Sequence, residues 1–143
     1  MNPPLQEGLG FLVTDLARLM RRAFEQRLQG GTLTLAQARA LLLVARHEGV
    51  RQIDLADRME VQPITLARLI DTLEQAGLVE RRADPADRRA YRIHLLPAAQ
   101  TELSAIAREA QAIRDLALRG LDPALTETTL AALRAMIHNL SGR

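Results

Sequence analysis

The sequence predicts a mainly α-helical protein that contains one small β-hairpin. Leu and Ala dominate a chain of 143 residues with 48% hydrophobic content, and both residue types favour helix. Apolar residues recur at three- and four-residue spacing along most of the chain, as in amphipathic helices. Residues 78–95 differ, because two short runs there flank an Asp-Pro turn. The length suits one domain, residues 1–143, around one core.

The first two predicted helices are separated by a pair of glycines. Gly30 and Gly31 end the first helix, and Thr34 is a candidate N-cap for the second. The second helix is almost entirely apolar, which predicts a central position in the core, and Gly49 closes it. The apolar stripe of the first helix consists of Leu9, Leu12, Val13, Leu16, Leu19, Met20, Phe24 and Leu28.

Two short amphipathic helices joined by a tight turn follow at residues 53–59 and 63–76. The turn is Glu60-Val61-Gln62, and Pro63 suits the first turn of a helix because its missing N–H is not needed there. The buried side of the first of these helices is expected to consist of Ile53, Leu55, Ala56 and Met59. The buried side of the second is expected to consist of Ile64, Ala67, Ile70 and Leu73, helped by Leu66 and Leu69.

A β-hairpin with an arginine-rich tip is predicted next. Residues 78–82 form one strand, residues 83–87 the turn and residues 89–95 the return strand. Five arginines are expected in or near the tip: Arg81, Arg82, Arg88, Arg89 and Arg92. A helix-turn-helix followed by such a hairpin is a winged helix-turn-helix, here over residues 33–96. In that arrangement one helix enters a DNA major groove while the wing lies along the backbone or in the minor groove.

The second short helix carries the candidate DNA-reading residues. Gln pairs with adenine, Arg pairs with guanine, and Thr binds phosphate or a thymine methyl group. The outward positions are Gln62, Thr65, Arg68 and Thr72, and Pro63 and Leu66 complete the predicted DNA-binding set of this helix. A merely solvated helix face is the alternative interpretation.

The wing carries both candidate DNA ligands and candidate organising residues. Arg88, Arg89 and Arg92 are the predicted DNA-binding arginines. Asp84 and Asp87 do not favour DNA directly, so we expect them to hold an arginine in place and to cap the turn. The alternative is a surface ion-pair cluster of little energetic consequence.

The two ends of the chain predict a dimer. One long helix is expected from Pro97 to about Leu118, and a last helix from Asp122-Pro123 to Leu140. Their apolar stripes, like that of the first helix, are broader than a small winged core can cover, which implies a partner. Residues 1–30 and 97–143 are therefore the predicted dimerisation helices of a homodimer.

Composition limits the other possibilities. The formal net charge is +2, and all 19 basic residues are Arg, which binds phosphate and guanine with a planar fork; a GC-rich genome would produce the same bias. The absence of Cys excludes disulfides. No apolar run reaches membrane-spanning length, and the first ten residues lack the pattern of a secretion signal. We therefore expect a cytoplasmic protein without membrane contact.

The chain resembles the MarR/SlyA family of winged-helix transcriptional regulators. Asp87, Arg89 and Arg92 match the Asp-x-Arg-x-x-Arg pattern of that family's wing. The segments PITLARLIDTLEQAGLVERR, LTLAQARALLLV and GFLVTDLARLMRRAF resemble its recognition helix with the wing entry, the preceding helix and the first helix of the SlyA-like branch. One departure is Leu96-Pro97 in place of Leu-Thr, which changes the cap of the next helix.

The resemblance implies an obligate homodimer that binds double-stranded DNA at a pseudo-palindrome. It also implies a crevice for a small effector, commonly an aromatic carboxylate, and a regulator that acts as a repressor. No cofactor is expected. No metal site is expected either, because His47, His94 and His138 lie far apart in sequence. No nucleophile–base pair or phosphate loop indicates an enzyme, so no catalytic residue is predicted. The alternative function is a helical dimerisation module that acts through protein contacts.

Overall fold

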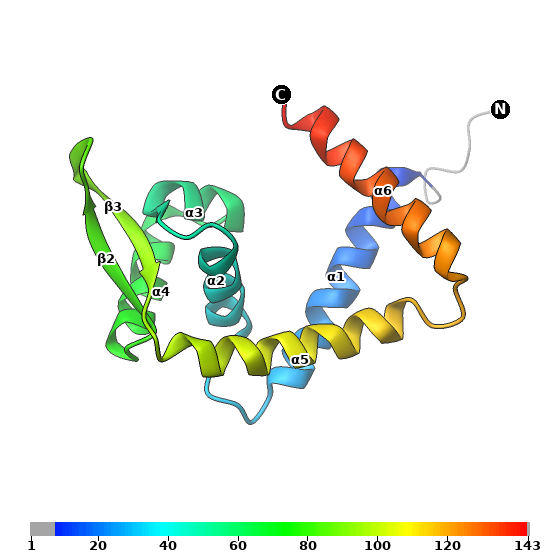
Figure 1. The fold of residues 1–143 in the computed structure, drawn as a ribbon, viewed down its shortest axis with the longest axis horizontal. Coiled ribbons are helices and arrows are strands. Elements are labelled where there is room, and N and C mark those ends of the chain that lie inside the picture. Colours follow the sequence, from blue (N-terminus) through cyan, green and yellow to red (C-terminus); the bar gives the residue numbers. More distant parts are fainter. Residues whose placement is uncertain (1–7, 143) are drawn as a thin grey trace. The chain divides into compact units, whose positions relative to one another are not determined.

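The computed structural model describes residues 8–142. The chain divides into two compact units, residues 1–110 and residues 111–143. Within residues 8–142 it forms six helices and three strands. Their bounds are α1 Leu9–Leu28, α2 Leu35–Arg46, β1 Val50–Arg51, α3 Gln52–Met59, α4 Pro63–Gln75, β2 Val79–Asp84, β3 Asp87–Leu95, α5 Ala99–Ala117 and α6 Pro123–Leu140 (Figure 1). The predicted fold class, mainly α with a β-hairpin wing, is confirmed.

Helix α2 forms the centre of the first unit and begins where its capping residues predict. Thr34 Oγ1 accepts a hydrogen bond from the backbone N–H of Gln37 at 3.2 Å, and Gln37 Oε1 accepts one from the N–H of Thr34 at 2.9 Å. This reciprocal capping box satisfies two N–H groups that a helix start leaves unpaired. The side chains of Ala38, Ala40, Leu41 and Val44 are buried.

Helices α3 and α4 pack beside α2 and are joined by the predicted tight turn. Glu60 adopts a left-handed backbone conformation, with φ 56° and ψ 41°. The N–H of Val61 then donates to the carbonyl of Ala56 at 3.1 Å. Pro63 occupies the first turn of α4, and the N–H of Leu78 donates to the carbonyl of Leu73 at its end. Backbone hydrogen bonds within the turn thus fix how α4 follows α3.

Two expectations about the buried faces of these helices are wrong. The side chains of Leu55, Ala56 and Met59 are buried as predicted. Ile53 and Ile64, however, are 47% and 61% exposed. The core side of α4 is formed by three fully buried residues: Leu66, Ile70 and Leu73.

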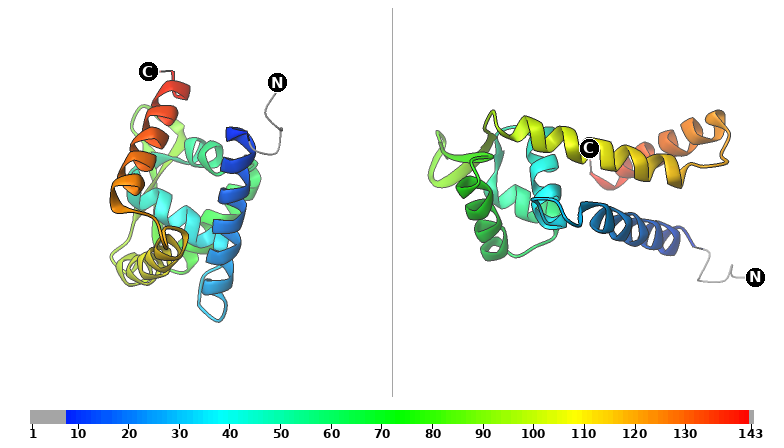
Figure 2. Two further views of the ribbon diagram at one scale, coloured as in Figure 1. Left: turned by 90° about the vertical axis from the view of Figure 1, so that its right-hand side faces the viewer. Right: turned by 90° about the horizontal axis from the view of Figure 1, so that it is seen from below.

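The hairpin is longer than predicted, and its turn is shorter. Strands β2 and β3 pair in antiparallel register from Val79↔Leu95 to Asp84↔Asp87, with an irregularity between Ala83 and Asp84. Only Pro85 and Ala86 form the turn, because the Asp84 carboxylate accepts the N–H of Ala86 at 3.0 Å and closes it tightly. The right view of Figure 2 shows the hairpin at the edge of the group formed by α2, α3 and α4.

The short segment before α3 is a third strand. Strand β1 pairs antiparallel with β3 through Val50↔Ile93 and Arg51↔Arg92, which gives the sheet order β1-β3-β2. Sequence periodicity does not show this pairing, because a two-residue strand is too short to carry a pattern. The wing is therefore joined to the start of α3 by backbone hydrogen bonds.

Helix α5 begins at Ala99 instead of Pro97. The carbonyls of Leu96 and Pro97 accept from the N–H groups of Ala99 and Gln100 in tighter turns. In the second unit, Asp122 caps α6 by accepting the N–H of Ala124 at 2.8 Å, as the Asp-Pro signal predicts. Within residues 8–142, no helix combines the length and the apolar character needed to cross a membrane.

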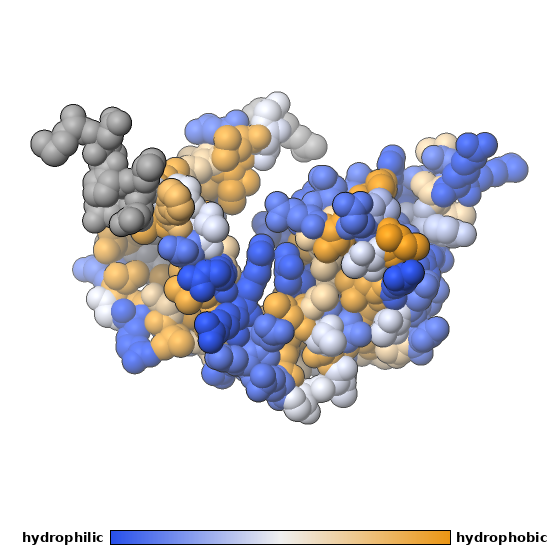
Figure 3. All heavy atoms as spheres, turned by 180° about the vertical axis from the view of Figure 1, so that it is seen from behind, coloured by the Kyte–Doolittle hydropathy of each residue, from blue (hydrophilic) through white to orange (hydrophobic). Residues whose placement is uncertain are grey.

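Large apolar side chains lie open to solvent in each unit (Figure 3). On α1 only Phe24 is buried. The exposed apolar residues of α1 are Leu9, Phe11, Leu12, Val13, Leu16, Leu19 and Met20. Those of the second unit are Leu116, Leu121, Leu125, Ile137 and Leu140.

Candidate nucleic-acid interface

The face of α4 that is opposite its buried side carries polar side chains that are exposed to solvent. Gln62, Pro63, Thr65, Arg68 and Thr72 are all exposed. Gln62 is the N-cap residue, and its side chain makes no capping hydrogen bond. The hydroxyl of Thr72 donates to the carbonyl of Arg68 at 3.1 Å. The helix start thus presents donors and acceptors of the kind that read base edges.

Leu66 does not belong to this exposed face. Its side chain is fully buried, one turn from the fully buried Ile70 on the core side of α4. A side chain without accessible surface has no means of contacting DNA, so the assignment of Leu66 to the DNA-binding set is wrong. Leu66 instead packs in the core, on the same side of α4 as Ile70 and Leu73.

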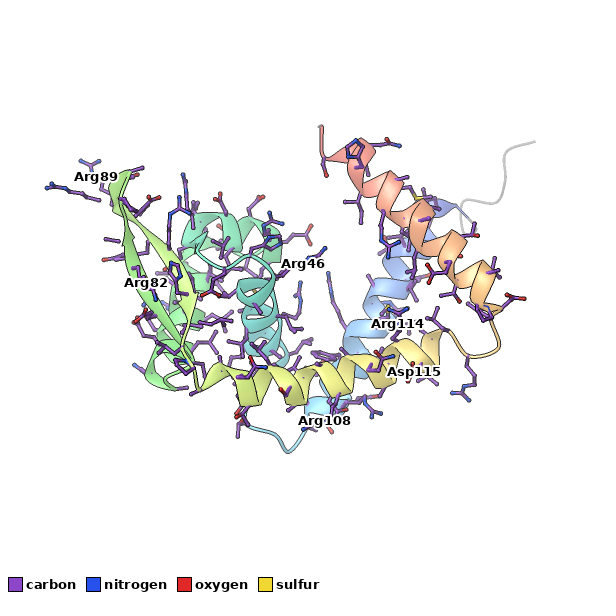
Figure 4. All side chains as sticks on the ribbon, in the orientation of Figure 1. Arg46, Arg82, Arg89, Arg108, Arg114 and Asp115 are labelled. Atoms are coloured by element: carbon purple, nitrogen blue, oxygen red, sulfur yellow. The ribbon has the colours of Figure 1, made fainter. Side chains whose placement is uncertain are left out.

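The tip of the hairpin presents two exposed arginines. Arg88 and Arg89 lie beside the turn on β3, and Figure 4 shows Arg89 at the tip, directed away from the helices. The Asp87 carboxylate accepts the backbone N–H of Arg89 at 3.0 Å. This contact orders the backbone from which the Arg89 side chain extends, while the guanidinium stays open to solvent.

Asp84 and Arg92 form the internal support of the wing. Asp84 is buried, with 4% of its surface exposed, and its Oδ1 lies 3.4 Å from Arg92 Nε. The hydrogen bond from the Ala86 N–H lowers the pKa of the Asp84 carboxyl, burial acts in the opposite direction, and Arg92 lowers the pKa further. Arg92 Nη1 also donates to the carbonyl of Gly49 at 3.0 Å. Arg92 therefore holds the wing to the α2–β1 connection.

Arg81 was predicted in or near the wing tip, and this prediction is wrong. Its side chain is only 15% exposed, and Nη1 lies 2.6 Å from the Asp71 carboxylate and 3.2 Å from that of Glu74. Nε donates to Gln52 Oε1 at 2.9 Å and Nη2 to the carbonyl of Ala67 at 2.9 Å. One side chain thus joins β2 to both helices of the helix-turn-helix.

The alternation of side chains along β2 could have predicted the inward position of Arg81. Side chains alternate across a strand, so Arg81 lies on the same face of β2 as Val79, which is fully buried. The paired residue on β3, Ile93, is also fully buried. This face is the inner one, whereas Arg82 on the outer face is exposed and pairs with Glu80.

A hollow of about 260 Å³ lies where α3, α4 and the wing meet. Arg51 and Arg89 supply positive charge, and Ile53, Pro63 and Tyr91 supply apolar surface. Arg51 was not among the predicted site residues, because β1 was not recognised as a strand that pairs with the wing. The hollow connects the N-terminus of α4 with the wing, so the two predicted DNA-contacting elements are adjacent.

The arrangement is that of a winged-helix DNA-binding protein: a helix with an exposed polar N-terminal face beside an arginine-tipped hairpin. In the part of the chain that the structure describes, no three His, Cys, Asp or Glu side chains gather closely enough to hold a metal ion.

Comparison with known proteins shows similarity to one family of transcriptional regulators. Residues 33–91 match the sequence model of the MarR family. A crystal structure of MarR has 26% sequence identity and a TM-score of 0.81, covering 99% of both chains. A MarR transcriptional regulator from Methanosarcina mazei Go1 has 23% identity and a TM-score of 0.80, covering 92% of this chain and 94% of that one.

A third similar structure bears on regulation. BpsR from Bordetella bronchiseptica has 24% identity and a TM-score of 0.74, covering 95% of this chain and 97% of its own. Its DNA binding is regulated by 6-hydroxynicotinic acid. Residues 33–91 thus match the MarR family in sequence, and the chain as a whole has the fold of MarR-family transcriptional regulators. Regulators of this family are in general not enzymes.

Proposed function

We propose that the protein is a repressor that binds a pseudo-palindromic operator as a homodimer. Helix α4 enters the major groove, and the wing follows the backbone into the adjacent minor groove. The observation that carries the proposal is the hollow that joins Pro63 at the start of α4 to Arg89 of the wing. Gln62, Thr65, Arg68 and Thr72 then face base edges and phosphates, together with Arg88 and Arg89. Asp84, Asp87 and Arg92 organise the wing, and Arg92 has part of its guanidinium left for DNA.

The dimer is supported by the exposed apolar side chains of α1 and, separately, of α6. Contiguous apolar surface of this kind is typical of association. In the proposed organisation, residues 1–143 act as one MarR-type domain. Residues 33–96 form the DNA-binding core, and residues 1–30 and 97–143 form the dimerisation helices.

A small-molecule effector is part of the proposal. BpsR responds to an aromatic carboxylate, and this chain has a groove of about 830 Å³ along α1 that carries cationic side chains. Arg18, Arg21 and Arg22 line it, together with Glu25 and Glu60. Guanidinium groups bind carboxylates through paired hydrogen bonds. The proposed effector is therefore a small aromatic carboxylate that releases the protein from DNA.

The second candidate function is a helical dimerisation module without specific DNA binding. The exposed apolar side chains of α1 and α6 suit both functions, whereas the exposed Arg88 and Arg89 favour DNA. A gel-shift assay at increasing salt separates the two, since DNA binding through phosphates weakens steeply as salt rises.

Footprinting on DNA selected from a random pool tests the proposed function. A two-fold dimer with one reading helix per subunit places its half-sites about 10 base pairs apart, which is one helical turn. We therefore expect protection of a single inverted repeat of roughly 15–20 base pairs. Protection of an isolated half-site by one subunit would show that the proposed assembly is wrong.

Replacing Arg89 by alanine should weaken operator binding without destabilising the fold. The guanidinium is exposed at the wing tip (Figure 4), and each lost phosphate contact reduces the log–log salt slope by about one unit. Asp87→Ala should act more weakly, because Asp87 holds only the backbone N–H of Arg89. Affinity is measured by fluorescence anisotropy at several salt concentrations.

Arg108→Ala is the matched control, since it removes an exposed arginine from α5, outside the wing. It should leave the salt slope unchanged. Normal operator binding by the Arg89 variant at every salt concentration contradicts the role of the wing. A large drop in its melting temperature would instead identify Arg89 as a structural residue.

A further inference from the structure

Ile64 lies open to solvent at the N-terminus of α4, although isoleucine is among the residues most often buried. Its side chain is 61% exposed. Successive helix residues are turned by about 100°, so Ile64 is directed away from the core side of the helix. That core side is defined by the fully buried Leu66, Ile70 and Leu73. Ile64 is therefore a surface residue by its position on the helix.

The neighbours of Ile64 are the polar side chains of the reading face. Arg68 follows it by four residues, which places both on one stripe of the helix, and Thr65 is adjacent. Both are exposed. Among the described residues, no hydrogen bond or ion pair holds the side chain of Gln62, Thr65 or Arg68. One aliphatic side chain thus stands within a group of polar side chains directed at the same partner.

The chemistry of the major groove supplies an apolar partner for such a side chain. The C5-methyl group of thymine is the apolar group that a base pair presents there, whereas cytosine presents an N4 amino donor. An aliphatic side chain gains by covering the methyl group. Against cytosine it would bury an amino group without an acceptor, which is unfavourable.

We propose that Ile64 selects a thymine in each operator half-site through contact with its C5-methyl group. The inference rests on the proposed function, in which α4 enters the major groove. It adds an apolar contact to the polar readout by Gln62, Thr65 and Arg68, and it accounts for an exposed isoleucine among them.

Replacing thymine by uracil in the operator tests the inference directly. Uracil keeps the Watson–Crick pair and lacks only the methyl group. With the full-length protein and an operator selected from random DNA, each thymine is replaced in turn, in both half-sites. We expect one position at which affinity falls about fourfold per half-site, the equivalent of roughly one buried methylene group. Ile64→Ala should bind the thymine operator more weakly and lose this sensitivity to uracil.

Gln75→Ala is the matched control variant. Gln75 is exposed three turns further along the same side of α4, so its replacement should leave the sensitivity to uracil intact. Melting temperatures should be equal in all variants, because both replaced side chains are exposed. The inference is overturned if uracil at every thymine leaves wild-type affinity unchanged. It is also overturned if Ile64→Ala retains the full loss on uracil DNA.

Failure of the proposed function is recognised before any uracil is introduced. If the wild type enriches no sequence from the random pool, specific DNA binding is wrong, and the methyl contact is wrong with it. An operator that is enriched but indifferent to uracil overturns the methyl contact alone.

Discussion

Replacing Arg81 by alanine should lower the free energy of unfolding by about 2–3 kcal/mol, since charged hydrogen bonds of low exposure are worth more than surface ion pairs. The 15%-exposed guanidinium contacts Asp71, Glu74, Gln52 and the carbonyl of Ala67. Its loss leaves two neighbouring carboxylates facing each other and separates β2 from both helices. Urea unfolding followed by circular dichroism measures the change.

Two further variants make this prediction specific. Arg82→Ala removes an arginine from the outer face of β2 that is 56% exposed and pairs with Glu80, and it should change stability by less than about 0.5 kcal/mol. Arg81→Lys should recover only part of the loss, because an ammonium group lacks the planar fork that reaches four partners. If the Arg81 and Arg82 variants are equally stable, the inner face of β2 does not depend on this side chain.

Deleting the chain from Leu121 onward should abolish the dimer and weaken operator binding by about 1,000-fold or more. A specific affinity in the nanomolar range corresponds to about −12 kcal/mol, and a single half-site retains roughly half of it. The deletion removes α6, whose Leu125, Ile137 and Leu140 are exposed. Sedimentation should show monomer or aggregate, and anisotropy titration measures the affinity.

A shorter truncation is the control for this deletion. Removal of the residues from Ser141 onward leaves α6 intact and should preserve both assembly and affinity. A soluble dimer that binds the operator normally after deletion from Leu121 would show that α6 is not needed for dimerisation, which contradicts the proposed division of residues 97–143.

Local signals were sufficient to predict where several helices begin. Thr34 and Gln37 cap α2, Pro63 begins α4 and Asp122 caps α6 through contacts between residues at most three positions apart. The short range of these interactions makes them visible in the sequence. The hairpin strands were predicted too short, because the turn signal of Asp84 and Pro85 does not show how far the pairing between the two strands continues towards the turn.

The sequence by itself determined the order of helices, the helix-turn-helix with its wing and the polar start of α4. Only the tertiary structure decided which arginines hold the fold together and which are exposed for contact with a partner. Arg81 is held on the inner face of β2 by a contact with Gln52, 29 positions away, whereas Arg92 is joined to the carbonyl of Gly49, 43 positions away. Arg89 stays exposed at the tip. The tertiary structure also decided that Leu66 is buried and Ile64 exposed. The physical reason is that periodicity defines an apolar stripe only to within about one position, and the partner across the core selects which residues of that stripe are covered.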